Sequence, residues 1–170
     1  MRQQKALQEY GEGLLFLQVP SAFWAARLVG LPLSAAWVLQ AIVSVAALAA
    51  VAWTFWRRRD PVLSNALLTV AIFLFAPYTL NYDMVIFGWV AALLLQRRDN
   101  EILDDYLIIG LWTLAATMML AGLVHVPLAM PLLAAFAGRL LWRLAKDEPR
   151  QQVGAGTPAG LAVPAIGPAR

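Results

Sequence analysis

The segment Pro77-Tyr78-Thr79-Leu80-Asn81-Tyr82-Asp83 interrupts an uncharged run that extends over residues 61–95. It places a proline, an asparagine, two tyrosines and a carboxylate between the apolar stretches 72–75 and 84–87. A lone Asp among such residues is costly to place inside a lipid bilayer, where ionisable side chains usually serve a function. The arrangement of the neighbouring helices therefore depends on this segment.

The composition is typical of a helical membrane protein. Of the 170 residues, 61% are hydrophobic and 14% are charged, whereas soluble domains have about 25% charged residues. The net charge of +3 does not predict nucleic-acid binding, because eight of the thirteen basic residues lie beside apolar runs, where they indicate membrane topology. These eight are Arg57, Arg58, Arg59, Arg97, Arg98, Arg143, Lys146 and Arg150.

The supply of metal-binding and redox side chains is small. The chain has no cysteine and one histidine. Disulfides, iron–sulfur ligation, thiol catalysis and a multi-histidine metal site are therefore excluded. We expect no metal site and no cofactor, and leave open whether a divalent cation binds.

The charge pattern predicts an all-α, polytopic membrane protein with five crossings. Residues 33–56 are uncharged and would form a helix of about 36 Å, which is enough to cross a hydrocarbon core of about 30 Å. Arginines flank residues 61–95 on both sides, so both ends of this run are expected in the cytoplasm and the chain turns back near Pro77. A shallow re-entrant hairpin is the alternative. The expected spans are residues 33–56, 62–76, 83–95, 106–124 and 127–145.

The flanking segments complete the expected topology. Residues 1–32 are predicted to form an external loop and a short interfacial helix, with Ser21 as N-cap, Gly30 as the stop and Trp24 at the headgroup level. Residues 147–170 are predicted to be a disordered cytoplasmic tail. The protein would then lie in the plasma (inner) membrane with its amino end outside. A first span that enters the membrane from outside, with Arg2 and Lys5 on the translocated side, is an awkward topology for an independent chain. We therefore expect the C-terminal part of a larger protein or a split gene product.

Several short motifs together resemble the C-terminal half of glycosyltransferase family 87. They are Pro20-Ser21-Ala22-Phe23, Ala26-Arg27-Leu28-Val29-Gly30, Gln40 in a span that begins near Ala36, Ala76-Pro77-Tyr78, and Asn81-Tyr82-Asp83 before Met84-Val85-Ile86. The resemblance covers about residues 19–145. The family is similar to the polyprenyl-phosphate-mannose-dependent alpha-1,2-mannosyltransferases, which have a GT-C architecture.

The resemblance implies a hexosyltransferase of the mannosyl type, with a polyprenyl-phosphate-linked sugar donor and an extracytoplasmic acceptor. It also implies a catalytic carboxylate in an external loop near the amino end of the full-length enzyme. Glu9 and Glu12 do not lie in a matching context. The catalytic base is therefore expected in a missing N-terminal half, on a separate or upstream chain, and no catalytic residue is assigned here.

Six residues are candidates for binding the donor, and each has a structural alternative. Asp83 would hold the phosphate-sugar head or a bridging cation, or would cap the helix that begins at Met84. Asn81 and Tyr82 would turn the chain and line the cavity, and Tyr78 would contact the donor or anchor the chain at the interface. Arg27 would pair with a lipid phosphate or with ordinary headgroups. His125 would contact phosphate, or would be an exposed loop residue.

The other charged or small residues within the spans have structural interpretations. The cluster from Arg97 to Asp105 is expected to be a solvated loop, with metal binding by Asp104 and Asp105 as the alternative. Arg139 is expected to snorkel toward the interface. The glycines within the last two spans are expected at close-packing points. They are Gly110, Gly122 and Gly138.

Two further functions compete with sugar transfer. The interrupted run 61–95 would also suit the discontinuous helix of a transporter or flippase subunit. A non-enzymatic membrane scaffold is the third interpretation. An upstream reading frame with several spans and an acidic first external loop would favour the transferase.

Overall fold

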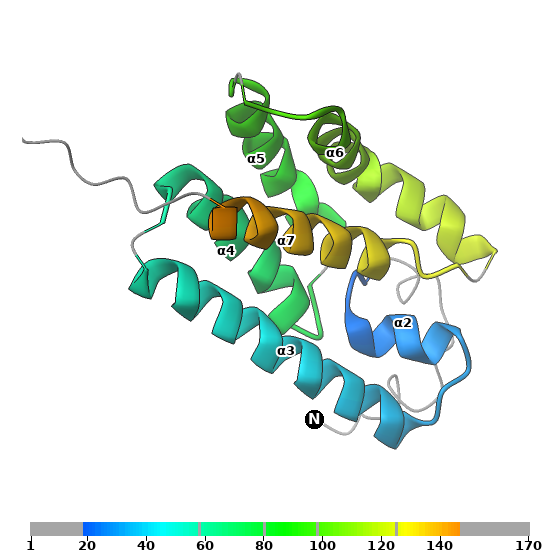
Figure 1. Cartoon of the computed structure of the whole chain (residues 1–170). Helices are drawn as coiled ribbons and strands as arrows, with labels where there is room; N and C mark the ends of the chain where they lie inside the picture. Colours follow the sequence, from blue (N-terminus) through cyan, green and yellow to red (C-terminus); the bar gives the residue numbers. More distant parts are fainter. Residues whose placement is uncertain (1–18, 58, 80, 98, 125, 147–170) are drawn as a thin grey trace, which may run out of the picture.

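The computed structural model describes residues 19–57, 59–79, 81–97, 99–124 and 126–146. Within these ranges the chain is entirely helical and has no strand, which confirms the all-α class. The expected external loop (residues 1–18), the tail (147–170) and His125 lie outside the described residues. In chain order the helices are α2 (Ala22–Leu28), α3 (Leu33–Trp56), α4 (Pro61–Phe75), the 3-10 helix η2 (Asn81–Val85), α5 (Ile86–Leu95), α6 (Ile102–Leu123) and α7 (Ala129–Lys146) (Figure 1).

The helices follow the expected runs closely. α3 has the predicted bounds, and the other expected spans begin and end within four residues of a helix. Among the described residues, α3 is the one helix long and apolar enough to cross a membrane, with a mean hydropathy of 2.1. Pro61–Phe75 and Asp83–Leu95 are shorter apolar helices. The structure therefore confirms the helices, and the five crossings stay a prediction.

α4 is the central helix of the bundle. It packs against α3, α5 and α7, while α6 packs against α5 and α7, and α2 packs against α3 (Figure 1). The main core lies between these helices and includes Leu63, Leu67 and Val70 of α4, all nearly inaccessible to solvent. The rings of Phe73 and Phe87 lie 4.5 Å apart and link α4 to α5 in this core. Removal of these side chains from solvent holds the two short helices together.

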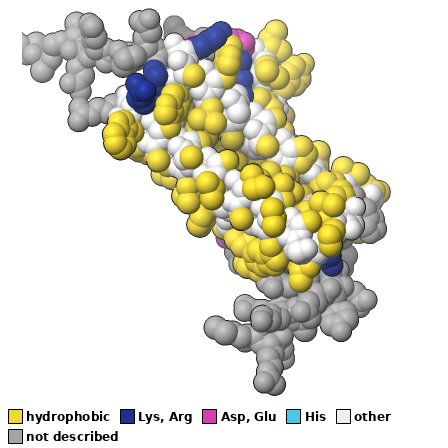
Figure 2. Space-filling model, turned by 60° about the horizontal axis from the view of Figure 1, so that its bottom comes forward, with side chains coloured by type: hydrophobic (Ala, Val, Ile, Leu, Met, Phe, Trp, Pro, Cys, Tyr) yellow, Lys and Arg dark blue, Asp and Glu magenta, His cyan; other side chains and the backbone are white. Residues whose placement is uncertain are grey.

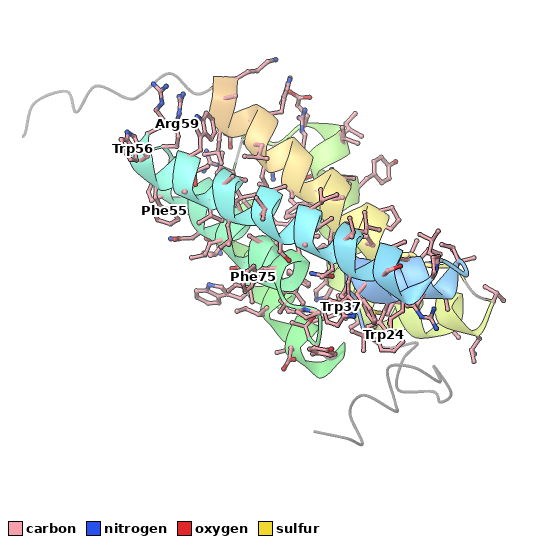
Figure 3. The ribbon with its side chains drawn as sticks, turned by 90° about the horizontal axis from the view of Figure 1, so that it is seen from below. Trp24, Trp37, Phe55, Trp56, Arg59 and Phe75 are labelled. Atoms are coloured by element: carbon pink, nitrogen blue, oxygen red, sulfur yellow. The ribbon has the colours of Figure 1, made fainter. Side chains whose placement is uncertain are left out.

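Successive helices bring two sets of helix termini together. The charged end contains the last residues of α3, α5 and α7 and the first residues of α4 and α6, and carries the described basic residues other than Arg27. The turn end contains the first residues of α3, α5 and α7 and the connection between α4 and η2. Figure 3 shows Trp56 and Arg59 near one end of α3 and Trp37 near the other. The polar residues of the bundle are therefore concentrated in two regions, the charged end and the turn end.

The outer surface between these ends is apolar. Ile42 and Val45 on α3 are 60% and 67% exposed, and Trp89 on α5 and Trp112 on α6 are 67% and 66% exposed. Figure 2 shows hydrophobic side chains along the length of the molecule, with most of the Lys and Arg side chains in view gathered at one end. Soluble monomers rarely expose continuous apolar surfaces of this extent. This surface needs a non-aqueous environment or a partner to cover it.

α2 forms a second, smaller core with the start of α3. Ser21 is the N-cap, because its Oγ accepts a hydrogen bond from the Trp24 backbone N–H at 3.3 Å. Trp24 is only 6% exposed and packs edge-on against Phe23, with ring centroids 5.1 Å apart. Trp24 is therefore buried within the protein and borders the residues that precede and begin α7. Its expected place at the headgroup level stays a prediction.

Small residues have different roles along the last two helices. A Cβ added to Gly110 would lie 3.3 Å from Leu132 Cδ1, so this glycine permits the close approach of α6 and α7. A Cβ on Gly138 would meet nothing within 4 Å. The expected close contact at Gly138 is therefore wrong, because this glycine borders open space. The structure does not describe the surroundings of Gly122.

Gly30 ends α2 by adopting a left-handed backbone conformation, with φ of 85°. We expect Gly30→Ala to lower the free energy of unfolding by about 1 kcal/mol, because a side chain is strained at this φ. Gly138→Ala is the matched control. It lies within a helix and has room for a methyl group, so it should leave stability unchanged or raise it by up to about 1 kcal/mol. Denaturant unfolding in detergent micelles measures both; equal effects would contradict the role of Gly30.

Candidate functional site

The connection between α4 and η2 forms the turn that the sequence predicted. α4 ends at Phe75, and Ala76, which precedes Pro77, has an extended backbone with φ −85° and ψ 123°. This conformation is the one favoured before proline. The chain then reaches Asn81, where η2 begins. The turn therefore exposes polar groups at one end of an apolar bundle.

Tyr78 lies in this turn and packs against α3. It is half exposed, and its ring centroid lies 6.5 Å from that of Trp37. Partial burial raises the pKa of the Tyr78 phenol above its ordinary value, so the hydroxyl stays neutral at pH 7 and can both donate and accept hydrogen bonds. This placement suits both an aromatic anchor and a ligand contact.

Asp83 lies within the helical turn that leads into α5. It is in the first turn of η2, and the N-cap position of α5 belongs to Val85, which makes no side-chain capping bond. The helical segment thus begins two residues before Asp83 and not at Met84; a contact of Asp83 with the backbone donors of this turn stays a prediction. The Asp83 side chain is exposed, and its charge complements the positive end of the helix dipole.

The remaining candidates are not gathered into one pocket by the described contacts. Arg27 donates a hydrogen bond from Nη1 to the Leu31 carbonyl at 3.0 Å, so it bridges the turn that follows α2. The side chains of Asn81 and Tyr82 and the whole of His125 lie outside the described residues. A cavity of about 30 Å³ lies between α2 and the start of α7. It has room for about one water molecule, so it is not a sugar pocket.

Gln40 is the polar group that joins three helices near the turn end. It is 3% exposed, and its Oε1 accepts a hydrogen bond from the Phe23 N–H at 3.0 Å. Its Nε2 donates to the carbonyls of Leu74 and Phe75 at 3.0 and 3.1 Å. These are last-turn carbonyls of α4 that have no partner within their own helix. One amide thus satisfies groups of α2 and α4.

Ser44 reinforces this arrangement. Its Oγ accepts a hydrogen bond from Gln40 Nε2 at 3.1 Å and donates one to the Phe75 carbonyl at 2.9 Å. In the sequence, Gln40 belongs to the motifs that resemble the glycosyltransferase family. The sequence could have predicted that Gln40 makes hydrogen bonds, since an amide in an uncharged 24-residue helix requires partners within the protein. What the sequence did not show was which backbone groups it reaches.

The charged end contains an ion-pair network centred on Asp104, which is only 4% exposed. Arg139 donates to both of its carboxylate oxygens, at 2.7 and 3.2 Å, and Arg143 donates to Oδ2 at 3.2 Å. The Glu101 N–H also donates to Oδ2 at 2.9 Å. The expected solvated loop is therefore wrong at Asp104, and Arg139 reaches the charged end through an ion pair, so its snorkelling stays a prediction. Both side chains turn inward because each finds its partner on the other helix.

The network extends across four helix termini. Arg143 donates to Asp99 at 2.7 Å, and Arg97 donates to Asp99 at 2.9 Å and to Asp60 at 3.0 Å. Asp60 also caps α4, because its Oδ1 accepts the N–H groups of Val62 and Leu63. The start of α4, the end of α5, the start of α6 and the end of α7 are thereby joined.

The carboxylates of this network are held ionised. Burial alone would raise the pKa of Asp104, but the hydrogen bonds from Arg139 and from the Glu101 N–H, with the charge of Arg143, lower it overall. The hydrogen bond from Arg97 holds the pKa of Asp99 well below its usual range. Within the described residues, no group of three or more His, Cys, Asp or Glu side chains is placed to hold a metal ion. Asp104 is occupied by arginines, so the metal interpretation of Asp104 and Asp105 is not supported.

No protein-family model, curated protein or solved structure matches this chain.

Proposed function

We propose that the chain is a polytopic membrane protein in which α3, α4, α5, α6 and α7 lie in the bilayer. The support is the exposure of α3. Only 17% of its most apolar window is buried, so it is not the core helix of a soluble domain. The positive-inside rule places the charged end in the cytoplasm and the turn end on the outer side. The 15 residues of α4 span about 22 Å, so the turn would lie below the outer lipid surface.

Within this arrangement, we propose that the protein takes part in transfer of a hexose from a polyprenyl-phosphate donor. One observation carries the proposal: the interrupted run 61–95 exposes Tyr78 and Asp83 at one end of an apolar bundle. The motif resemblance supplies the donor class. A lipid-linked donor would keep its chain in the bilayer and present its sugar at this end.

The residues at the turn end would position the donor. A carboxylate accepts hydrogen bonds from sugar hydroxyls, and it would contact the phosphate only through a cation, since two anions repel. Asp83 is therefore assigned to the sugar hydroxyls or to a bridging cation, and Tyr78 to a neutral hydrogen bond. The base that deprotonates the acceptor would come from another segment, such as the expected N-terminal half. The contribution of this chain is orientation.

Sugar transport is the second candidate, because the break between α4 and η2 resembles the discontinuous helices of transporters. The two functions differ in a measurable product. A transporter moves the lipid-linked sugar across the bilayer without breaking its sugar–phosphate bond, whereas a transferase releases polyprenyl phosphate. The fate of the donor separates them.

The direct test is transfer of radiolabelled mannose from polyprenyl-phosphate mannose in membranes that contain the chain, alone or with the polypeptide encoded upstream. Asp83→Asn should lower transfer by about 10- to 100-fold, the equivalent of losing a charge-assisted hydrogen bond. Asp105→Asn, which changes an exposed acid at the other end of the bundle, is the matched control and should retain transfer. Absence of transfer in both preparations, or equal activity of the two variants, would contradict the proposal.

A further inference from the structure

An apolar groove runs between α3 and α7, over the surface of α4. Its volume is about 260 Å³, and its lining includes Ala46 and Ala50 of α3, Ala71 of α4, and Ala134 and Gly138 of α7. Ala46, Ala134 and Gly138 are exposed, so the groove opens to the outer surface. An apolar cavity of about 150 Å³ is sufficient to bind benzene. The groove therefore has room for a segment of hydrocarbon chain.

The helix faces that line the groove lead to basic residues at the charged end. On α3 the face at Ala46 and Ala50 continues, three and four residues at a time, to Trp53 and Arg57. On α7 the face at Ala134 and Gly138 continues to Trp142 and Lys146. Residues at these spacings share one face of a helix. Both walls of the groove therefore end in a tryptophan followed by a cation.

The tryptophans at this end hold cations against their rings. The Arg59 guanidinium carbon lies 5.3 Å from the centroid of Trp53, and Lys146 Nζ lies 3.7 Å from the centroid of Trp142. Arg57 and Lys146 are exposed. Asp60, the acid next to these arginines in the chain, accepts hydrogen bonds from Arg97 and from the start of α4.

We propose that the groove binds one acyl chain of an anionic phospholipid, with the phosphate held at the charged end by Arg57 and Lys146. The apolar lining fits hydrocarbon, and the exposed cations fit a phosphate that carries net negative charge. The two features lie on the same helix faces, so one molecule can satisfy both. Tryptophan and arginine at such a level are common at membrane interfaces, and basic pockets between membrane helices bind anionic headgroups. The inference depends on placement in a membrane and not on sugar transfer.

Native mass spectrometry of the detergent-purified protein, titrated with dioleoyl-phosphatidylglycerol or dioleoyl-phosphatidylcholine, tests the headgroup. We expect tighter binding of phosphatidylglycerol to the monomer. The double variant Arg57→Gln/Lys146→Gln should weaken its binding by about 25-fold, that is, about fivefold for each basic residue. Both side chains are exposed, so folding should be retained. Arg27→Gln, which removes a cation at the turn end, is the control and should bind normally.

Gly138→Leu tests the groove with the same titrations. The Cβ has no neighbour within 4 Å, so the new side chain should fill the groove without displacing the helix and weaken binding of both lipids. Ala135→Leu, an exposed position of α7 that does not line the groove, is the control, and Ala134→Leu is a second groove variant. Equal binding of the two lipids, unchanged binding by the double variant, or unchanged binding by both groove variants would overturn the proposal. So would a lipid-free dimer that dissociates on groove substitution, since a second copy would then occupy the groove.

Discussion

Replacing Asp104 with alanine is expected to lower the free energy of unfolding by about 3–5 kcal/mol. The Asp104 side chain is 5% exposed and pairs with Arg139 and Arg143. Its removal leaves the Arg139 side chain, 11% exposed, without its closest partner, and the Arg143 side chain, 10% exposed, without one of its two carboxylates. A buried charge that loses its partner costs far more than the pair contributes. Denaturant unfolding in detergent micelles measures the change.

Asp105→Ala is the matched control for this prediction. It removes the same charge from the next residue of the same helix turn, but from an exposed side chain. Its effect should stay within about 0.5 kcal/mol. Similar losses for the two variants would show that the negative charge at the helix start matters, and that the pairing of Asp104 does not.

The carboxylates of the ion-pair network also predict how the free energy of unfolding responds to acid. The pKa values of Asp60, Asp99 and Asp104 are all lowered in the folded protein from a reference of 3.8. Their stabilising effect is thus complete above about pH 5 and is lost as the pH falls below about 4, where the unfolded chain binds protons first. Asp104→Ala should show a shallower loss over this range, because it has one such carboxyl fewer. An unchanged pH profile would contradict this account.

Gln40→Met is expected to lower the free energy of unfolding by about 2–4 kcal/mol. Methionine keeps much of the shape of glutamine but removes the amide. The Phe23 N–H and the Leu74 carbonyl then lose the partners that they have at 3.0 Å, in a position where water cannot replace them. Backbone groups left without partners in a low-dielectric environment carry the full cost of desolvation.

Gln40→Met should loosen α2 in particular, in addition to lowering the stability of the whole fold. Because Gln40 holds the start of α2, hydrogen exchange of the amides in Ala22–Leu28 should become faster in the variant, while the amides of α6 should be unaffected at the same fraction folded. Gln96→Met, which changes an exposed glutamine at the end of α5, is the control and should alter neither. A loss below about 0.5 kcal/mol would mean that the Gln40 amide is not needed to join the helices.

The helices were predictable from the sequence because their signals are local. The uncharged stretch 33–56 forms α3 with the expected bounds. Ser21 caps the start of α2 and Gly30 follows its end, while α4 ends just before Pro77. Each of these features depends on residues within one or two helical turns. The turn at residues 77–83 was predictable for the same reason, although the position of Asp83 within η2 was not. The helical segment begins two residues earlier than the sequence indicated.

The roles of buried polar residues were not predictable, because their partners are distant in the chain. In the sequence, Asp104 is one of several acids in a polar segment. In the structure it accepts a hydrogen bond from Arg139, 35 residues away. Gln40 bonds a carbonyl 34 residues away. The donor candidates were likewise chosen by their place in the chain, and the structure places Arg27 against Leu31 and Tyr78 against Trp37.

By itself, the sequence determined that the chain is helical, where its helices begin and end to within about four residues, and that most of its charges lie apart from its apolar runs. Local backbone preference and the cost of burying charge are sufficient for these properties. Only the tertiary structure decided which charges are buried as pairs, which apolar faces remain outside, and which small residues border a groove. These properties depend on which helix faces meet, and many pairings satisfy the same apolar pattern. In this chain, the pairing of helix faces that the structure adopts is accompanied by a few polar contacts between distant residues. Asp104 and Gln40 are at the centres of these contacts.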